Sequence, residues 1–596
     1  MIRKTPGDPM TQCSAGRDQH AGRRRSARRQ RLAASLAVLA IVASGIGHGA
    51  PRLLDPDNPE DAVRLQQKLW CSLEEGQPAL LWSQGSVYGR IPGERDRKLF
   101  DFQIWNARAC SNVRDPKRGL GYRSVSREIM LYIDPATGQL LRQWRNPFTG
   151  ETVNVIHTQN DPVNMAAPLF AYDTEGKPYK FEATFAEGRV IASNEAPLFY
   201  DNPLGGAFQE YVGGRYHAME MLNVFVYEKD LLDPAVKTLT RWSRSWKRVS
   251  GFLPWMRMGD RPGSLVFTAV GQRVQSVDQL PEPIRTALRT EFAKYQTPPP
   301  LDDPRPNETS WTYFKRVFAA EKSSQRGDAA GAPAMEATPA AAAAPAPAAA
   351  LAAAAAGLET RDFAYEYARD CPAAAGGALT TQWRGRVYSR RAGEKDRHLL
   401  DLRRTRTARC ELLSSTVQGR GYRVTAAESM DYLAPGGAEP LQEWTNPWTG
   451  EQVKVVGVRL DPAPAIEVWE RRSDGTPSTR ETRFVLTDKL LIGSDADAQF
   501  IKNPLGGEYQ DFIGGQLQIL DYTTTETPLA LARQRAAAYE RRVKAPATAA
   551  TRSTTVPARD TVLSWGQVTP WLPWMKMGSR QGELVIHAAA VQKEGP

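Results

Sequence analysis

Histidine, amide and carboxylate side chains gather in two short stretches of the first half of the chain. The residues are His157, Asn160, Asp161, Asn164, His217 and Glu220. Imidazole titrates near neutral pH, and a positioned carboxylate can give or take a proton, so these groups have the means for acid–base chemistry. We therefore take His157, Asn160, Asp161, His217 and Glu220 as candidate catalytic residues and Asn164 as a candidate ligand-binding residue.

The same residues allow a structural interpretation. A single histidine beside apolar residues of a strand is commonly a hydrogen-bonded core residue, and Asn-Asp-Pro commonly builds a turn. The chain has no CxxC or HExxH zinc motif, no GxSxG, no P-loop and no GxGxxG after a strand. We predict no metal site and no cofactor, and whether the protein is an enzyme stays open.

An internal repeat provides a comparison for these residues. The segment WRNPFTGETVNVIHTQNDPVN begins at Trp144, and WTNPWTGEQVKVVGVRLDPAP begins at Trp444, an offset of 300 residues. The second copy keeps the turn residues and the alternating valines but has Gly457 in place of His157 and Gln518 in place of His217. If there is a chemical site, we expect it in the first copy only.

A second repeated element is rich in tryptophan and methionine. LPWMRMG begins at Leu253 and LPWMKMG begins at Leu572. One interpretation is a pocket for an apolar ligand, with Trp242, Trp246, Trp255 and Met256 as candidate ligand-binding residues. The other is core packing, which the presence of the element in both copies favours, because aromatic side chains dominate core energetics.

The charge of the chain is concentrated at its N-terminus. The net charge is +11, of which residues 1–50 carry +7. Because the remainder has no basic cluster, we predict no nucleic-acid binding. In the leader, arginines precede an apolar run from Leu32 to Gly47, which is shorter than a membrane span and typical of a signal peptide. We expect a periplasmic or extracellular protein with no membrane span in the mature chain; an uncleaved signal helix that tethers the protein is the alternative.

Cysteine spacing agrees with export. Cys71 and Cys110 are 39 residues apart, and so are Cys371 and Cys410. Two cysteines at matching places in both copies predict one disulfide per copy, which persists in an oxidising compartment.

Short strand-like segments, separated by glycine, proline and asparagine about every ten residues, indicate antiparallel sheet. We predict an all-β protein made of two homologous barrel- or sandwich-like domains with a few peripheral helices, and we prefer the barrel because it leaves no exposed edges. The expected divisions are an export signal at 1–50, a first repeat with a C-terminal helical extension at 53–318, a disordered Ala/Pro-rich linker at 319–358 and a divergent second repeat at 359–596.

The motifs NPFTGE, NDPVN, NPLGG, LPWMRMGDRPG and NETSWTYF occur in this order in the first copy. Together they resemble a family of uncharacterised proteins, domain-of-unknown-function family 1838. The resemblance covers residues 55 to 318 and most of the second copy, which lacks NETSWTYF. It implies no established activity.

Two functional hypotheses follow. In the first, an exported protein binds a small, largely apolar molecule inside a β-rich domain. In the second, the protein is an enzyme with a single His/Asn/Asp site in the first repeat, and the second repeat is structural. The sequence does not indicate the oligomeric state.

Overall fold

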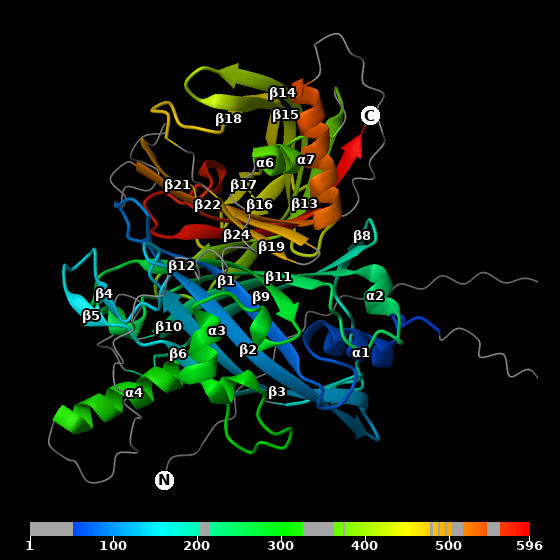
Figure 1. The fold of residues 1–596 in the computed structure, drawn as a ribbon, viewed down its shortest axis with the longest axis vertical. Coiled ribbons are helices and arrows are strands. Elements are labelled where there is room, and N and C mark those ends of the chain that lie inside the picture. Colours follow the sequence, from blue (N-terminus) through cyan, green and yellow to red (C-terminus); the bar gives the residue numbers. More distant parts are fainter. Residues whose placement is uncertain are drawn as a thin grey trace, which may run out of the picture. The chain divides into compact units, whose positions relative to one another are not determined.

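A computed structural model describes residues 52–165, 167–202, 204, 215–325, 363–373, 376–476, 481–486, 489–494, 497–502, 516–544 and 561–595. The predicted signal, residues 326–358 of the predicted Ala/Pro-rich linker and most of both NPLGG elements lie outside these ranges, whereas residues 319–325 of the predicted linker are helical. The protein is mostly antiparallel strand, as predicted, with two sheet-rich halves that correspond to the two repeats (Figure 1).

The first repeat is built on one ten-stranded sheet with the order β6-β3-β2-β1-β12-β11-β10-β9-β8 and β7 paired to β3. The strands are β1 (Ala79–Arg90), β2 (Arg97–Asp115), β3 (Gly119–Ile133), β6 (Thr158–Asn164), β7 (Leu169–Phe170), β8 (Thr184–Ala186), β9 (Arg189–Asp201), β10 (Arg215–Tyr227), β11 (Trp242–Ser250) and β12 (Ser264–Val274). The two ends of this order are not paired with each other in the described residues, so the sheet is open, whereas we preferred a closed barrel.

The second repeat has the same strand order, β18-β15-β14-β13-β24-β23-β22-β20-β19, with β21 paired to β22. Its strands are β13 (Ala378–Arg390), β14 (Arg397–Ser415), β15 (Gly419–Leu433), β18 (Val458–Trp469), β19 (Glu481–Leu486), β20 (Lys489–Ser494), β21 (Asp497–Lys502), β22 (Gln516–Pro528), β23 (Val562–Thr569) and β24 (Glu583–Gly595). The shared order supports duplication of one domain.

The first sheet is strongly curled. Phe102 of β2 and Trp246 of β11 are three strands apart in the order, which in a flat sheet would separate them by about 14 Å. Their ring centroids are only 5.9 Å apart. The sheet therefore wraps around an inner face, on which side chains from non-neighbouring strands meet.

A short hairpin in each repeat supports this inner face. In the first, β4 (Gln143–Arg145) pairs with β5 (Thr152–Asn154). Asn146 accepts hydrogen bonds from the backbone N–H groups of Phe148 and Thr149, and donates to the carbonyl oxygen of Met256 at 2.8 Å. Asn446 repeats these contacts between β16 (Glu443–Thr445) and β17 (Gln452–Lys454), with Met575 as the acceptor at 2.9 Å.

Helices cover parts of both sheets. They are α1 (Pro59–Trp70), α2 (Glu228–Leu232), α3 (Ile284–Thr290) and α4 (Ser310–Gln325) in the first half, and α6 (Phe363–Asp370) and α7 (Leu529–Lys544) in the second. The helix α7 follows β22 as the short α2 follows β10 in the first repeat, and it is the longer of the two. None of the described helices combines the length and apolar composition needed to span a membrane.

The helix α4 carries the NETSWTYF motif, which only the first repeat has. Thr309 caps its N-terminus by accepting a hydrogen bond from the N–H of Thr312 at 3.2 Å. Trp311 packs against Tyr216 of β10, with ring centroids 4.7 Å apart, and the hydroxyl of Tyr313 accepts a hydrogen bond from Gln159 of β6 at 2.9 Å. The first turn of α4 therefore bridges β6, at one end of the strand order, and β10, near the other.

Each repeat contains one disulfide, as predicted. Cys71 bonds to Cys110 and Cys371 bonds to Cys410. Each bridge ties the residue that follows an N-terminal helix, α1 or α6, to the second strand of the sheet. In the first repeat the covalent link adds to polar contacts that also hold α1, such as the hydrogen bond from the backbone N–H of Leu120 to Glu60 at 3.3 Å.

The two repeats contact each other through matched residues. Arg90 pairs with Asp96, and Asp96 accepts a hydrogen bond from Gln518 of the second repeat at 2.8 Å. Arg390 pairs with Asp396, and Asp396 bonds to His217 of the first repeat at 2.8 Å. Each arginine also donates to the backbone carbonyl of the residue across the contact, Gln518 or His217. The same contact is therefore made twice, with the repeats exchanged, as in a two-fold dimer interface.

One polar chain across this contact has no matched counterpart. Glu195 of β9 accepts hydrogen bonds from His587 of β24 at 2.8 Å and from Arg386 of β13. Asn223 donates to Nε2 of His587 at 2.8 Å, which fixes the ring as the neutral form with a proton on Nδ1. Glu195 and His587 also line a groove of about 360 Å³ between the repeats. These buried groups bind the repeats to each other.

We predict that the Cys71–Cys110 bond stabilises the first repeat by about 2–4 kcal/mol, the range expected for a loop of this length. The double variant Cys71→Ala/Cys110→Ala should lose this amount in denaturant unfolding followed by circular dichroism. Reduced wild-type protein serves as the control and should lose at least as much, because reduction opens both bridges. An unchanged unfolding midpoint in the variant would contradict a stabilising role.

We also predict that His217→Gln is tolerated, because Gln518 occupies the matched place and binds Asp96. His217→Leu should lower the free energy of unfolding by about 2 kcal/mol, since it removes one hydrogen bond from the buried carboxylate of Asp396, which keeps that of Arg390. Gln518→Leu is the matched variant on the other side and should cost a similar amount. Equal losses for His217→Gln and His217→Leu would show that the contact is not exchangeable.

Candidate functional site

Strand register separates the two residues of the predicted His217/Glu220 pair. Alternate residues of β10 face opposite sides of the sheet. His217, Met219 and Met221 face the second repeat, where both methionines pack with Tyr388 and Tyr522. Glu220 faces the inner side. The two residues therefore do not form one site.

His157 lies at the edge of the inner aromatic cluster. Its Nδ1 accepts a hydrogen bond from the backbone N–H of Tyr132 at 3.1 Å, and its ring stacks on that tyrosine. Burial lowers the pKa of His157 to about 3, and the charge of Arg142 acts in the same direction. The ring stays neutral at physiological pH, which suits a structural acceptor better than a proton carrier.

Asp161 and Asn164 face the outer side. Asp161 forms ion pairs with Arg127, Lys294 and Arg305 at 2.8–3.1 Å. Burial would raise the pKa of Asp161, but hydrogen bonds from these three cations outweigh it and lower the pKa. Asn164 pairs with Val125 of β3, beyond an irregularity in the register that places it on the opposite face from Asn160.

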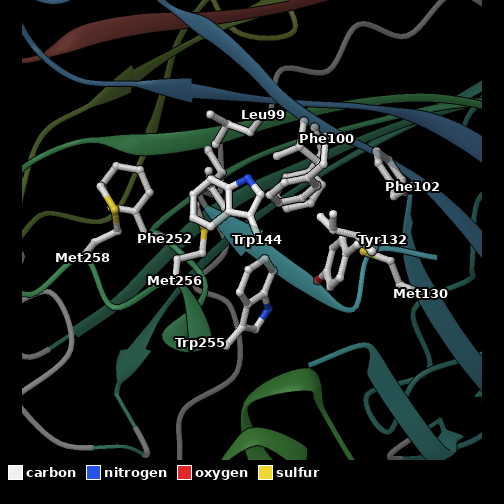
Figure 2. Close-up of a cluster of buried hydrophobic side chains, with 14 of the residues drawn as sticks. Leu99, Phe100, Phe102, Met130, Tyr132, Trp144, Phe252, Trp255, Met256 and Met258 are labelled. Atoms are coloured by element: carbon white, nitrogen blue, oxygen red, sulfur yellow. The ribbon is translucent and has the colours of Figure 1, made fainter. Parts of the chain in front are cut away.

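The four predicted Trp/Met ligand residues are packed against other core side chains. Trp255 and Met256 are at most 1% exposed and lie among Phe100, Tyr132 and Trp144 (Figure 2). Trp242 packs edge-on against Trp70, and Trp246 packs between Phe102 and Phe267. A ligand could reach Trp255 or Met256 only by displacing core residues.

Two of the predicted residues, Asn160 and Glu220, do share a cluster, together with residues that the sequence analysis did not single out. This polar cluster occupies the inner face beyond the aromatic core, and its members are Asn106, Arg108, Glu128, Asn160, Glu220, Arg244 and Arg248. On β2 the inner face changes from Phe100, Phe102 and Ile104 to Asn106 and Arg108 within a few residues.

The charged members of the polar cluster face one another without forming close ion pairs. Glu128 accepts only long hydrogen bonds, from Asn106 at 3.4 Å and Asn160 at 3.5 Å. Arg248 reaches Glu220 at 3.5 Å, and Arg244 donates through Nε to the hydroxyl of Ser83 at 2.8 Å. Arg108 stacks over Trp70 and forms no ion pair with the described residues. Among the described residues, the charges of the polar cluster are therefore neutralised only in part by direct contacts.

Glu220 is a partly exposed carboxyl group with a raised pKa. Burial raises its pKa to about 7, with the carboxylate of Glu128 acting in the same direction and Arg244 opposing it. Its side chain keeps 37% of its surface exposed. The carboxyl group is therefore crowded by protein atoms and still in contact with solvent.

Several buried polar atoms of the polar cluster lack a protein partner among the described residues. They are Oδ1 of Asn106, Oδ1 of Asn160, Nε of Arg108 and Nε of Arg248. Buried polar atoms are rarely left unpaired, because each costs about 1–3 kcal/mol. Water or a ligand is the natural source of the missing hydrogen bonds, because both can donate to or accept from such groups.

The second repeat has lost this arrangement. Where the first repeat has Arg108, Asn160 and Arg244, the second has Ala408, Leu460 and Leu563. The carboxylate that matches Glu128, Glu428, is paired through both oxygens with Arg404 at 2.8 and 3.0 Å. In place of the Glu220–Arg248 pair it has Asp521, which accepts hydrogen bonds from Trp565 and Gln567. Its polar groups are closed by direct contacts.

Sequence reasoning missed the arginines, although a signal was present. In TRWSRSWKRVS, Trp242, Arg244, Trp246 and Arg248 alternate, so both arginines share the buried face of the tryptophans. The second repeat has Leu563 and Gln567 at the positions of Arg244 and Arg248, so these two arginines occur in the first repeat only. No group of histidine, cysteine and carboxylate side chains in the described part of the chain is arranged to hold a metal ion.

Comparison with known proteins identifies a family but no activity. No curated protein matches the chain. Among solved structures, the matches include OccK8 (OprE) of Pseudomonas aeruginosa, at 7% identity and TM-score 0.16, covering 88% of this chain and 99% of that one. OmpF of Salmonella typhi in complex with daunomycin matches at 7% identity and TM-score 0.12, covering 87% and 98%. TM-scores this low do not indicate a shared fold.

The sequence profile described as "Protein of unknown function (DUF1838)" matches residues 76–318 and again residues 376–595. These two ranges make up most of the chain and correspond to the two ten-stranded sheets described above. The protein is therefore a member of the DUF1838 family, with two tandem copies of its domain.

Proposed function

We propose that this is an exported protein whose first repeat binds a small molecule in the space surrounded by the polar cluster, and whose second repeat is a supporting domain. The observation that carries the proposal is the concentration of buried, unpartnered polar atoms around Glu220, Arg244 and Arg248. The two disulfides are consistent with export.

The surroundings of the polar cluster support a ligand that is only partly polar. Tyr132, Tyr216 and Trp70 lie against its arginines: Arg248 donates to the hydroxyl of Tyr216, and Arg108 stacks over Trp70. A molecule with one polar end could place that end among the charged groups and its apolar part against aromatic side chains. This is how small-molecule sites are usually built.

The helix α4 supports the assignment to the first repeat. Through Trp311 and Tyr313 it bridges β10 and β6, the strands that carry Glu220 and Asn160. The second repeat lacks the NETSWTYF motif and also lacks most of the polar cluster. If α4 serves the site, a repeat that has lost the site is expected to have lost this helix as well.

A second candidate function, an enzyme at the same place, is favoured by Glu220. A carboxyl group with a pKa near 7 that faces a solvent-accessible space has the protonation behaviour of a general acid or base. The three arginines would then stabilise negative charge that develops on the substrate. In this case the second repeat again has only a supporting role.

We predict that protein purified from its own host retains a small molecule that native mass spectrometry detects. Arg244→Leu, which introduces the residue of the second repeat, should release it, because the ligand loses a buried guanidinium. Gln567→Ala, in the second repeat, is the control and should leave the retained mass unchanged. Equal retention by wild type and Arg244→Leu would refute the proposed location.

For an enzyme, the same molecule should be converted by wild type and should remain intact on Glu220→Gln protein. Conversion that is unaffected by this variant would exclude Glu220 as the acid or base and leave the binding function in place.

We predict that His157 affects stability and not binding. The unfolded chain takes up a proton on His157 below about pH 6.5, whereas the folded protein does so only near pH 3. Stability from the neutral imidazole is thus fully present above about pH 6.5 and is lost as the pH falls, by about 1.4 kcal/mol per pH unit.

His157→Gln removes this titration but keeps an oxygen that can accept from the N–H of Tyr132. The difference in unfolding free energy between wild type and this variant should therefore shrink between about pH 6.5 and about pH 4, measured by urea titrations. A difference that is constant with pH would contradict the buried neutral state, and loss of the retained ligand in this variant would contradict a purely structural role.

A further inference from the structure

The polar cluster contains more positive than negative charge. Arg108, Arg244 and Arg248 face Glu128 and Glu220, and burial lowers the pKa of Arg244 only to about 10, so this guanidinium stays charged at neutral pH. The carboxyl group of Glu220 is ionised only in part near pH 7. The interior therefore has a surplus of one to two positive charges, which is costly unless an anion or water compensates it.

Several N–H donors of the three arginines have no acceptor among the described residues. Arg108 makes no hydrogen bond with the described residues, Arg248 has an unpartnered Nε, and Arg244 uses only its Nε, on Ser83. Gly271 lies between Arg244 and Ser83 in the sheet register, and a side chain there would collide with Ser83, so the glycine keeps this approach open. Guanidinium groups with free N–H donors match the geometry of carboxylate oxygens.

We propose that the ligand of the first repeat carries a carboxylate, which binds between Arg108, Arg244 and Arg248, and that Glu220 takes up a proton when it binds. This inference rests on the proposed function and names the chemical class of its ligand. The second repeat provides the contrast, since Ala408, Leu563 and Gln567 stand at the matched positions and bring no positive charge.

The groups that face Glu220 determine whether ligand binding favours its protonated or its ionised form. These are Glu128 of β3, Tyr200 of β9, and Arg244 and Arg248 of β11. A bound carboxylate adds a second negative charge beside Glu128, so the protonated form of Glu220 becomes more favourable. Below about pH 6.5 Glu220 is already protonated in the free protein, and affinity should not depend on pH. Above about pH 7 binding must include proton uptake, and Kd should rise by up to tenfold per pH unit.

The test uses the full chain and calorimetric titration with benzoate, and with benzamide as an uncharged probe of nearly the same shape, from about pH 5.5 to about pH 8.5. Acetate and acetamide form a smaller pair in case the space excludes a ring. We expect the carboxylate of at least one pair to bind at least tenfold tighter than its amide near pH 6, and its Kd to rise above pH 7. In Glu220→Gln the Kd should stay at the low-pH value throughout. Asp521→Asn, the matched change in the second repeat, should leave the wild-type pH dependence intact.

The remaining outcomes separate this proposal from the one on which it rests. If the amides bind as tightly as the acids, with affinity lost in Arg244→Leu, the site in the first repeat stands and a carboxylate ligand is refuted. If the carboxylates bind with a pH dependence that Glu220→Gln does not remove, proton uptake at Glu220 is refuted. If no probe binds and native mass spectrometry finds no retained molecule, both proposals fail. Folding of each variant is checked by its circular dichroism and melting temperature, and Arg248→Gln, which introduces the residue of the second repeat, replaces any variant that does not fold.

Discussion

The curl of the first sheet is the constraint on which the rest of the structure depends. The contact of Phe102 with Trp246 holds strands from different parts of the sheet around one inner face. Trp144 and Trp255 pack against Phe100 on that face (Figure 2). Because strand side chains alternate, every second residue beyond this aromatic core must also point inward. For this reason Asn106 and Arg244 are buried and Arg108 and Arg248 are half-buried. The curl that the aromatic core maintains thus places these polar side chains on the inner face, where burial is unfavourable for them.

The duplication separates what the fold requires from what the site requires. Both repeats keep the hairpin asparagine, the Trp/Met element and the disulfide. Only the first keeps the arginines, Asn160 and the α4 cover. In the second, Glu428 is closed by Arg404, which shows that the same fold is compatible with an interior whose charges are paired directly. The unpaired arrangement of the first repeat is therefore not a consequence of the fold.

The contact between the repeats explains the position of one predicted catalytic residue. His217 donates a hydrogen bond to Asp396 as Gln518 does to Asp96. The position therefore requires a hydrogen-bond donor and no acid–base group. Burial lowers the pKa of His217, and the charge of Arg390 adds to this effect. A neutral imidazole and an amide are then equivalent in function. Glu220, three residues along the same strand, has the opposite orientation and a different environment.

By itself the sequence determined the antiparallel strands, the tandem repeat and the cysteine pairs, because alternation, turn residues and equal spacing are local properties or direct comparisons of the two copies. It also indicated that a site would belong to the first copy. Only the tertiary structure decided that Glu220 faces the interior and His217 the second repeat, since a two-residue period gives relative orientation but not which face is inside. It likewise decided that Glu128, Arg108 and Arg244, which are far apart in the sequence, face the same space, because that depends on how strongly the sheet curls.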